Sequence, residues 1–286
     1  MGRMTSRRRV FRVVDGELTM RPDTLSAEEP LEIRVAGKAL TITMRTPGSD
    51  FDLAAGFLVG EGIVHQGADV AGIRYCAGAS RASGDGSNTY NIVDVVLRAG
   101  VPLPDPSMER NFYTTSSCGL CGKASLDAVR TTLRWPVTAD PLAVGPEVLT
   151  GLPDALREAQ KVFDRTGGLH AAGLFDASGR LLCVREDVGR HNAVDKVVGW
   201  AAREGRLPLT GTMLMVSGRA SFELVQKAAM AGIPLLAAVS APSSLAVELA
   251  EEVGLTLVGF LRGSSMNVYT RADRLGLHDP LQLVER

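Results

Sequence analysis

Apolar and polar residues alternate along two short stretches near the start of the chain. Leu31–Val35 and Leu40–Met44 place apolar residues at every second position, the period of a half-buried β-strand. The intervening Ala36–Ala39 contains a glycine, so the pattern predicts a β-hairpin. A turn and N-cap at Pro47–Asp50 then precede a predicted helix over Phe51–Gly62, where apolar residues recur at helical spacing.

Two further strands are predicted over 73–76 and 91–97. With the hairpin and the helix, they make residues 1–110 a small N-terminal α+β domain. The proline-rich Val101–Pro106 is typical of a stiff linker, and we place a domain boundary there, with a second domain over 111–286.

The second half of the chain alternates strands with helices. A helical pattern over 146–164, open to a break at Gly151 and Pro153, is followed by a strand pair at 169–175 and 180–185. The later predicted elements are helices 190–203, 219–231 and 243–253, strands 212–217, 234–240 and 255–261, and a short last strand at 267–270. Such alternation predicts an α/β domain with βαβ crossovers, a mostly parallel sheet with an antiparallel edge, and helices on both faces.

Composition limits the classes of function. The chain has 286 residues, 45% of them hydrophobic, and a formal net charge of −1, which argues against a broad nucleic-acid or membrane surface. No apolar run reaches the roughly 18 residues that a membrane span needs. The arginines near the N-terminus, Arg3 and Arg7–Arg9, are expected to form a solvated, flexible tail. Four cysteines are too few for a disulfide framework in a chain of this size, so we expect a reducing cytoplasm.

Cys118 and Cys121 stand in C-x-x-C spacing between a hydroxyl-rich run and a predicted helix over 123–133. Backbone N–H groups at a helix N-terminus favour a thiolate, and Lys123 adds positive charge. We therefore expect a reactive, partly exposed sulfur on a mobile loop.

The C-x-x-C spacing alone leaves three interpretations open. Half of a zinc site, or inert thiols, is one, although Cys76 and Cys183 are distant and form no second pair. A thioredoxin-like motif is weak, because it belongs after the first strand of a βαβ unit and about 110 residues precede it here. Sulfur handling is the third, since persulfidation needs the same thiolate character and access.

Three predicted strand ends carry hydroxyl groups, glycines and arginines. The segments are 216–221 with Arg219, 239–244 with three serines, and 259–265 with Arg262 and Gly263. Ligands of open α/β sheets bind beyond the carboxyl ends of strands, and these groups suit phosphate oxygens. The alternative is ordinary helix capping, which fits Ser243. No Walker A or G-x-G-x-x-G sequence is present, so an anionic, nucleotide-like ligand of another class is expected.

A polar run over 186–196 follows the predicted strand at 180–185 and includes the first residues of the predicted helix over 190–203. Asp187 can cap the helix, and spacing of four residues puts His191 with Asp195 on one face, and Asn192 with Lys196. The run is either a hydrogen-bonded helix surface or a metal, proton-transfer or substrate site. His170, in an apolar strand, is expected to be a core residue.

Four motifs together resemble the FdhD/NarQ family, and the resemblance covers about 31–270. They are Ser116–Ser125 with its C-x-x-C, Gly168–Ala172, Glu186–Lys196 and Val216–Glu223. The family's members are sulfur carrier proteins that make formate dehydrogenase active.

The resemblance implies a cytidine deaminase-like fold for the main domain and a homodimer. It implies that an IscS-type cysteine desulfurase passes sulfur to Cys118 as a persulfide, with Cys121 as its partner in the motif. The acceptor would be the molybdenum cofactor in its bis(molybdopterin guanine dinucleotide) form, or its tungsten counterpart, before insertion into formate dehydrogenase. The segment Phe260, Leu261, Arg262, Gly263, Ser264 and Ser265 matches the family's cofactor-binding loop. GDP or a GMP-like ligand is expected to bind there, and no structural metal is implied.

Two rival functions remain open. A deaminase-like zinc hydrolase needs an H-x-E motif, but His170 is followed by two alanines, so the catalytic glutamate is missing there. A non-catalytic chaperone of the cofactor would need neither cysteine.

Overall fold

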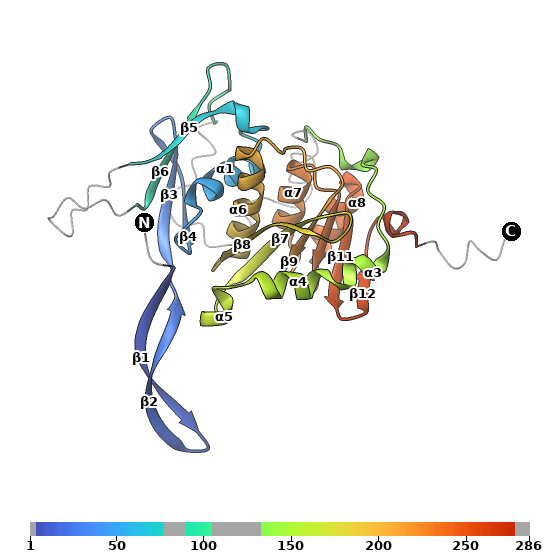
Figure 1. Cartoon of the computed structure of the whole chain (residues 1–286). Helices are drawn as coiled ribbons and strands as arrows, with labels where there is room; N and C mark the ends of the chain where they lie inside the picture. The colour runs from blue at the N-terminus through green and yellow to red at the C-terminus, as the bar shows by residue number, and fades with distance from the viewer. Residues whose placement is uncertain (1–3, 77–89, 105–132, 278–286) are drawn as a thin grey trace.

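The computed structural model describes residues 4–76, 90–104 and 133–277 (Figure 1). Among the helices of these ranges, none has the length and apolar character needed to cross a membrane.

Arg7–Arg9 lie in a β-ribbon rather than in the expected flexible tail, and Arg3 lies outside the described residues. Strand β1 (Thr5–Val14) pairs antiparallel with β2 (Glu17–Ser26) over their full length. Asp15 and Gly16 have φ angles of 51° and 85°, the left-handed conformation that a tight two-residue hairpin turn requires. We call this ribbon the arm; in Figure 1 it projects away from the rest of the chain.

A four-stranded sheet follows, in the order β4-β3-β6-β5. Its strands are β3 (Glu29–Val35), β4 (Lys38–Arg45), β5 (Val70–Tyr75) and β6 (Ile92–Leu97), accompanied by helix α1 (Asp50–Gly60) and the 3-10 turn η1 (Gly67–Asp69). The predicted hairpin, helix and two later strands are therefore confirmed. Strands β3 and β6 are parallel, while the two outer pairs are antiparallel.

A six-stranded sheet, in the order β12-β11-β10-β9-β7-β8, forms the larger part. Its strands are β7 (His170–Asp176), β8 (Leu181–Asp187), β9 (Thr212–Val216), β10 (Leu235–Ala238), β11 (Thr256–Arg262) and β12 (Ser265–Val268). Strands β9, β10 and β11 are parallel, and the other three pair antiparallel. The expected mixed α/β sheet is confirmed. The last strand starts two residues earlier than predicted, because Gly263 (φ 51°) turns the chain straight back from β11.

Helices cover both faces of the six-stranded sheet (Figure 1). They are α3 (Pro146–Thr150), α4 (Leu152–Ala159), α5 (Phe163–Thr166), α6 (Arg190–Arg203), α7 (Phe222–Met230) and α8 (Ser244–Val253), with the short turns η3 (Val137–Ala139) and η4 (Ala272–Leu275). Leu152 and Leu156 of α4 pack with Met213, whereas Val194 of α6 packs with Leu214 on the opposite face. Alternate residues of β9 thus belong to different cores, as the pleat of a sheet with two covered faces requires.

Helices α1 and α6 cross at a contact between glycines. A methyl group at Gly56 would lie 1.8 Å from the carbonyl oxygen of Asp195, and one at Gly199 would lie 1.7 Å from that of Asp52. One apolar cluster accordingly includes Leu31 of the four-stranded sheet together with core residues of α6. This continuous core crosses the expected boundary near residue 110, and the division into two domains stays a prediction.

Candidate functional site

Cys118, Cys121 and the helix predicted after them lie outside the described residues. The predicted cofactor loop, in contrast, is described along its whole length. It comprises the last three residues of β11, the turn at Gly263 and Ser264, and the first residue of β12. The site is therefore built from the ends of the strands.

A cavity of about 620 Å³ lies at the carboxyl ends of the three parallel strands, and we call it the strand-end pocket. Ser217 follows β9, Val239 follows β10, and Arg262 ends β11. His170 joins them because β7 runs antiparallel to β9, which brings its first residue to the same edge. Both the position and the volume are typical of small-molecule sites.

The predicted loop contributes only part of its length to this pocket. Leu261, Arg262 and Gly263 line it. Phe260, Ser264 and Ser265 are exposed and are not among its lining residues. The register of β11 is irregular here and Phe260 has a φ of 52°, which separates its side chain from those that follow. Arg219 is also exposed, between β9 and α7, and is not part of the lining.

Arg262 lies at the rim of the strand-end pocket, where a hydrogen bond to the end of the adjacent strand β10 fixes it. Its Nε donates a hydrogen bond to the carbonyl oxygen of Val239 at 3.1 Å. The side chain is exposed, and among the described residues no carboxylate forms an ion pair with it. An anchored guanidinium without a counter-ion suits an anionic group, since its two terminal nitrogens form a fork for phosphate oxygens.

The opposite wall was missed by the sequence analysis. It includes Arg157 and Gln160 at the end of α4, and Phe163 at the start of α5. The guanidinium of Arg157 lies 4.7 Å from the centre of the Phe163 ring. Glu186 fixes this wall, because its carboxylate accepts hydrogen bonds from the backbone N–H groups of Val162 (2.9 Å) and Phe163 (2.8 Å). The sequence alone could not show that Glu186 binds the start of α5, because this contact depends on α5 packing against β8.

His170 is not the core residue that its apolar strand predicted. It is half-buried in the wall of the strand-end pocket, because it is the first residue of β7 rather than a central one. Burial, helped by the charge of Arg190, lowers the pKa of His170, so its imidazole is neutral at pH 7.

A second histidine lies where helices α6 and α7 begin. Nε2 of His191 is 3.1 Å from Oγ of Ser221 and 3.1 Å from Oε2 of Glu223. Burial, and then the positive charges of Arg190 and Lys227, lower the pKa of His191 to about 3. The contacts of His191 are therefore hydrogen bonds of a neutral ring at pH 7.

Asp187 does not cap helix α6. The N-cap is Gly189, and Oδ1 of Asp187 accepts from its N–H at 2.8 Å and from the amide of Asn192 at 3.0 Å. Oδ2 of Asp187 is 2.6 Å from Nζ of Lys196, which also donates to the carbonyl oxygen of Thr46 at 2.9 Å. These contacts join α6 to β8 and to the turn before α1. The expected cap at Ser243 is confirmed, since its hydroxyl accepts from the N–H of Ala246.

The other polar residue of the run, Asp195, pairs outside its helix rather than with His191. Its Oδ1 lies 2.7 Å from Nζ of Lys227 on α7, and both side chains are buried. Burial opposes the charge of Lys227, but the carboxylates of Asp195, Glu61 and Glu223 outweigh it and raise the pKa of Lys227. The polar run is thus largely an internal network rather than a helix surface.

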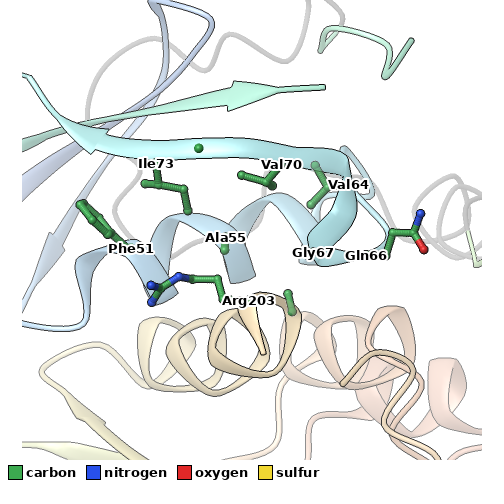
Figure 2. Close-up of a pocket in the computed structure, with 10 residues that line it drawn as sticks. Phe51, Ala55, Val64, Gln66, Gly67, Val70, Ile73 and Arg203 are labelled. Carbon is green, nitrogen blue, oxygen red and sulfur yellow. The ribbon is translucent and has the colours of Figure 1, made fainter. Parts of the chain in front are cut away.

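A smaller cavity, of about 310 Å³, lies between β5 and helices α1 and α6 (Figure 2). Phe51, Ala55, Val70 and Ile73 face it and Arg203 lies at one side, and its surface is about equally polar and apolar. None of the predicted site residues belongs to it, so it is not the place where the sequence predicted chemistry. Among the described residues, no group of three or more His, Cys, Asp or Glu side chains is placed to hold a metal ion.

The described residues define an α/β protein with a cavity at the carboxyl ends of its parallel strands. The chain belongs to the FdhD/NarQ family, whose model matches residues 26–276, so the resemblance is confirmed. It is 68% identical to the sulfur carrier protein FdhD of Streptomyces coelicolor over 278 residues, which cover 97% of this chain and 98% of the relative. It is 59% identical to the protein of that name from Mycobacterium tuberculosis, over 96% of this chain and all of the relative.

A solved structure supports the same fold. It is that of a protein from Desulfotalea psychrophila named for a formate dehydrogenase accessory role, with a TM-score of 0.73 and 23% identity. The match covers 96% of this chain and all of the other, and it shows the likeness of fold.

Proposed function

We propose that this chain is a sulfur carrier that accepts sulfur as a persulfide on Cys118 and delivers it to a guanine-nucleotide form of the molybdenum cofactor. The observation that carries the proposal is the 68% identity, over nearly the full length of both chains, to a protein named as a sulfur carrier. The pocket supports it, because a carrier for such a substrate needs a site for phosphate oxygens, and Arg262 is available for them.

The loading step is a thiolate exchange. The thiolate of Cys118 attacks the terminal sulfur of a persulfide on an IscS-type cysteine desulfurase. A new sulfur–sulfur bond forms at Cys118, the old one breaks, and the desulfurase cysteine leaves as a thiolate. The positive end of the predicted helix and Lys123 favour the attacking thiolate.

The strand-end pocket supplies the binding step. Arg262 offers its terminal nitrogens to phosphate, and the backbone at Gly263 has no side chain to obstruct close approach. Ser217 and Gln160 can hydrogen-bond a nucleotide, and Phe163 offers a ring face. These groups suit the guanine-nucleotide end of the substrate, and GDP or GMP is the simplest probe of the site.

The release step involves the second cysteine. The thiolate of Cys121 attacks the inner sulfur of the Cys118 persulfide, a Cys118–Cys121 disulfide forms, and hydrosulfide leaves toward the substrate. A cellular thiol reductant then restores both thiols. The partners of the cycle are the desulfurase and formate dehydrogenase, acting in the cytoplasm, without nucleic acid or membrane.

The test of loading is mass spectrometry of the intact chain after incubation with a cysteine desulfurase and cysteine. An adduct of about +32 Da, one sulfur atom, mapped to Cys118 is expected. Cys118→Ala should lose it while retaining the fold by circular dichroism, and Cys183→Ala, which changes a buried thiol in β8, should keep it. An adduct that is absent, or that survives in Cys118→Ala, contradicts the proposal.

The zinc content of the purified protein and an activity assay in cells distinguish the rival functions. Zinc bound in a ratio of one per chain, with no sulfur adduct, favours a deaminase-like hydrolase. A cofactor chaperone without sulfur chemistry predicts that Cys118→Ala still supports formate dehydrogenase activity in cells. Loss of that activity in Cys118→Ala, with normal protein levels, is the outcome we expect.

A further inference from the structure

The two faces of the arm carry different residues. Alternate residues of a strand point to the same side, and directly opposed residues of two paired strands do so as well. One face of the arm therefore combines two arginines near its base with four large apolar residues toward its tip. These residues are Arg7, Arg9, Phe11, Val13, Leu18 and Met20, and we call them the basic–apolar face.

The basic–apolar face is open to water. Phe11 is 67% exposed, Val13 and Leu18 are each 65% exposed, and Met20 is 60% exposed. Four adjacent large apolar side chains at this exposure are typical of a surface that binds another molecule.

The charges of the arm are unevenly distributed between its faces. Glu17 and Asp23 both lie on the opposite face, where Asp23 stands directly across from Arg8. The basic–apolar face therefore carries the two positive charges of Arg7 and Arg9 and no carboxylate. Both arginines are exposed, and neither forms an ion pair with any other described residue. The complementary surface is an apolar groove with carboxylates beside it.

We propose that the basic–apolar face docks into an apolar groove bordered by carboxylates on the enzyme that receives the cofactor. The choice of that enzyme rests on the proposed function, and the position of the arm supports it. At the base of the arm, the hydroxyl of Ser26 donates to the carbonyl oxygen of Gly168 at 3.4 Å. Gly168 lines the strand-end pocket, so an enzyme held by the arm lies beside the pocket from which the cofactor has to leave.

The size of the face suits a partner that must be released again. Each of the four apolar side chains removes roughly 100 Å² from water, so docking buries about 800 Å² when both surfaces are counted. This is below the roughly 1,200 Å² at which stable interfaces begin, and it is typical of transient encounters. A carrier that serves one enzyme molecule after another needs an interface of this kind.

A lipid surface fits the arm less well than a protein does. Asp15 and Glu17 lie at the tip, next to the apolar residues. Entry of the tip into a membrane would bury both carboxylates at a high cost, and anionic head groups would repel them. The distribution of charge along the arm therefore favours a protein partner.

The experiment compares two double variants of the full chain in binding to a purified, cofactor-free formate dehydrogenase by surface plasmon resonance. Arg7→Glu with Arg9→Glu inverts both charges of the basic–apolar face and should raise the dissociation constant by about 30-fold or more. Arg12→Glu with Arg21→Glu makes the same change of charge on the opposite face, and at physiological salt it should stay within about threefold of the wild type. None of these four arginines stands across the ribbon from a carboxylate, so the two variants are matched.

The apolar half of the face is tested in the same way. Phe11→Ser with Leu18→Ser removes apolar area from the contact and should also weaken binding by about 30-fold. Val14→Ser changes an apolar residue of the same strand on the opposite face, and should leave the dissociation constant within about threefold.

Equal effects of the two arginine double variants overturn the proposal, and so does a wild type that fails to bind the dehydrogenase at tens of micromolar. Sedimentation of the same samples and their binding to vesicles of phosphatidylglycerol test other occupants of the face. If Arg7→Glu with Arg9→Glu changes only the mass of the assembly or only vesicle binding, the proposal is overturned as well.

Sulfur loading of Cys118 by the desulfurase is read separately in these samples by mass spectrometry. A loss of loading confined to Arg7→Glu with Arg9→Glu assigns the face to the sulfur donor and overturns the proposal. If no sample loads sulfur, the proposed carrier function fails, while the difference in dehydrogenase binding between the two double variants still decides the docking surface.

Discussion

Lys196 and Asp187 form an ion pair of 2.6 Å whose two side chains are almost completely removed from solvent. The pair joins helix α6 to the end of β8, and Lys196 reaches further to the carbonyl oxygen of Thr46 before α1. Every oxygen of the Asp187 carboxylate has a donor, so the buried charge is satisfied on both sides.

Removing the lysine should therefore be costly. In Lys196→Met the carboxylate of Asp187 keeps its backbone donors but loses its counter-ion, and we expect a loss of about 3–5 kcal/mol in the free energy of unfolding. Urea denaturation measures it. Lys38→Met, which changes an exposed lysine in β4, should stay within about 0.5 kcal/mol of the wild type. Equal stabilities of the two variants would contradict the buried pair.

Arg262 should contribute to nucleotide binding more than Arg219 does. Arg262→Ala removes a charged donor from the pocket rim and should weaken GDP binding about 10- to 100-fold by calorimetry. Arg219→Ala changes an exposed arginine that follows β9 and does not line the pocket, and should alter the affinity less than about threefold. The reverse order would move the binding site from the β11 end to the start of α7.

His191 makes stability depend on pH. Its pKa of about 3 in the folded chain lies below its ordinary value of 6.5, so the unfolded chain binds more protons on acidification. The contribution of the neutral His191 ring to the free energy of unfolding is fully present above pH 6.5, and it is lost as the pH falls from 6.5 toward 3. At pH 5 the loss from this group is about 2 kcal/mol.

His191→Gln should remove that part of the pH dependence. The difference in free energy of unfolding between the wild type and His191→Gln, measured by urea denaturation at pH 7.5 and at pH 5, should shift in favour of the variant at the lower pH. An unchanged difference would mean that the imidazole is not buried as described. His170, with its pKa also lowered, retains a dependence of the same sign in both proteins.

The crossing of α1 and α6 should not tolerate a methyl group. Gly199→Ala brings a carbon against the backbone oxygen of Asp52, so the helices must separate, at a cost of about 1–3 kcal/mol or more. Gly72→Ala is the control, because no atom lies within 4 Å of the added methyl group. Thermal unfolding of both variants measures the effect; similar midpoints would contradict the close helix contact.

Local pattern predicted most strands and helices, since the periods of two and 3.6 residues are written directly in the order of residues. The helix over 190–203 agrees with α6 at both ends. The pattern over 146–164 breaks into three helices. The first break is at Gly151, which the sequence marked, whereas Pro153 lies in the first turn of α4 and the second break, at 160–162, was not predicted. Each of the three predicted strand ends contributes a residue to the strand-end pocket, because the carboxyl ends of parallel strands share one edge, while ligand binding there stays a prediction.

The arm was missed although its signal is present. Asp15 and Gly16 form the strongest two-residue hairpin sequence, and apolar residues alternate on both sides of it. The neighbouring arginines favoured the prediction of a solvated tail, because charged side chains usually face water, and the alternating apolar residues were not used. Arg157 and Phe163 could not be found in the same way, since which helix closes a pocket depends on packing between distant elements.

Glu186 and Asp187 are consecutive residues of β8, and the pleat of the strand sends them to opposite sides of the sheet. Glu186 holds the start of α5 at the pocket wall, while Asp187 holds α6 and the turn before α1. A shift of this strand end would therefore displace the ligand wall and the interhelical packing at the same time. Substitutions that widen the pocket at α5 by moving this strand end are therefore expected to lower the stability of the core. Pocket width and core stability are expected to change together in evolution.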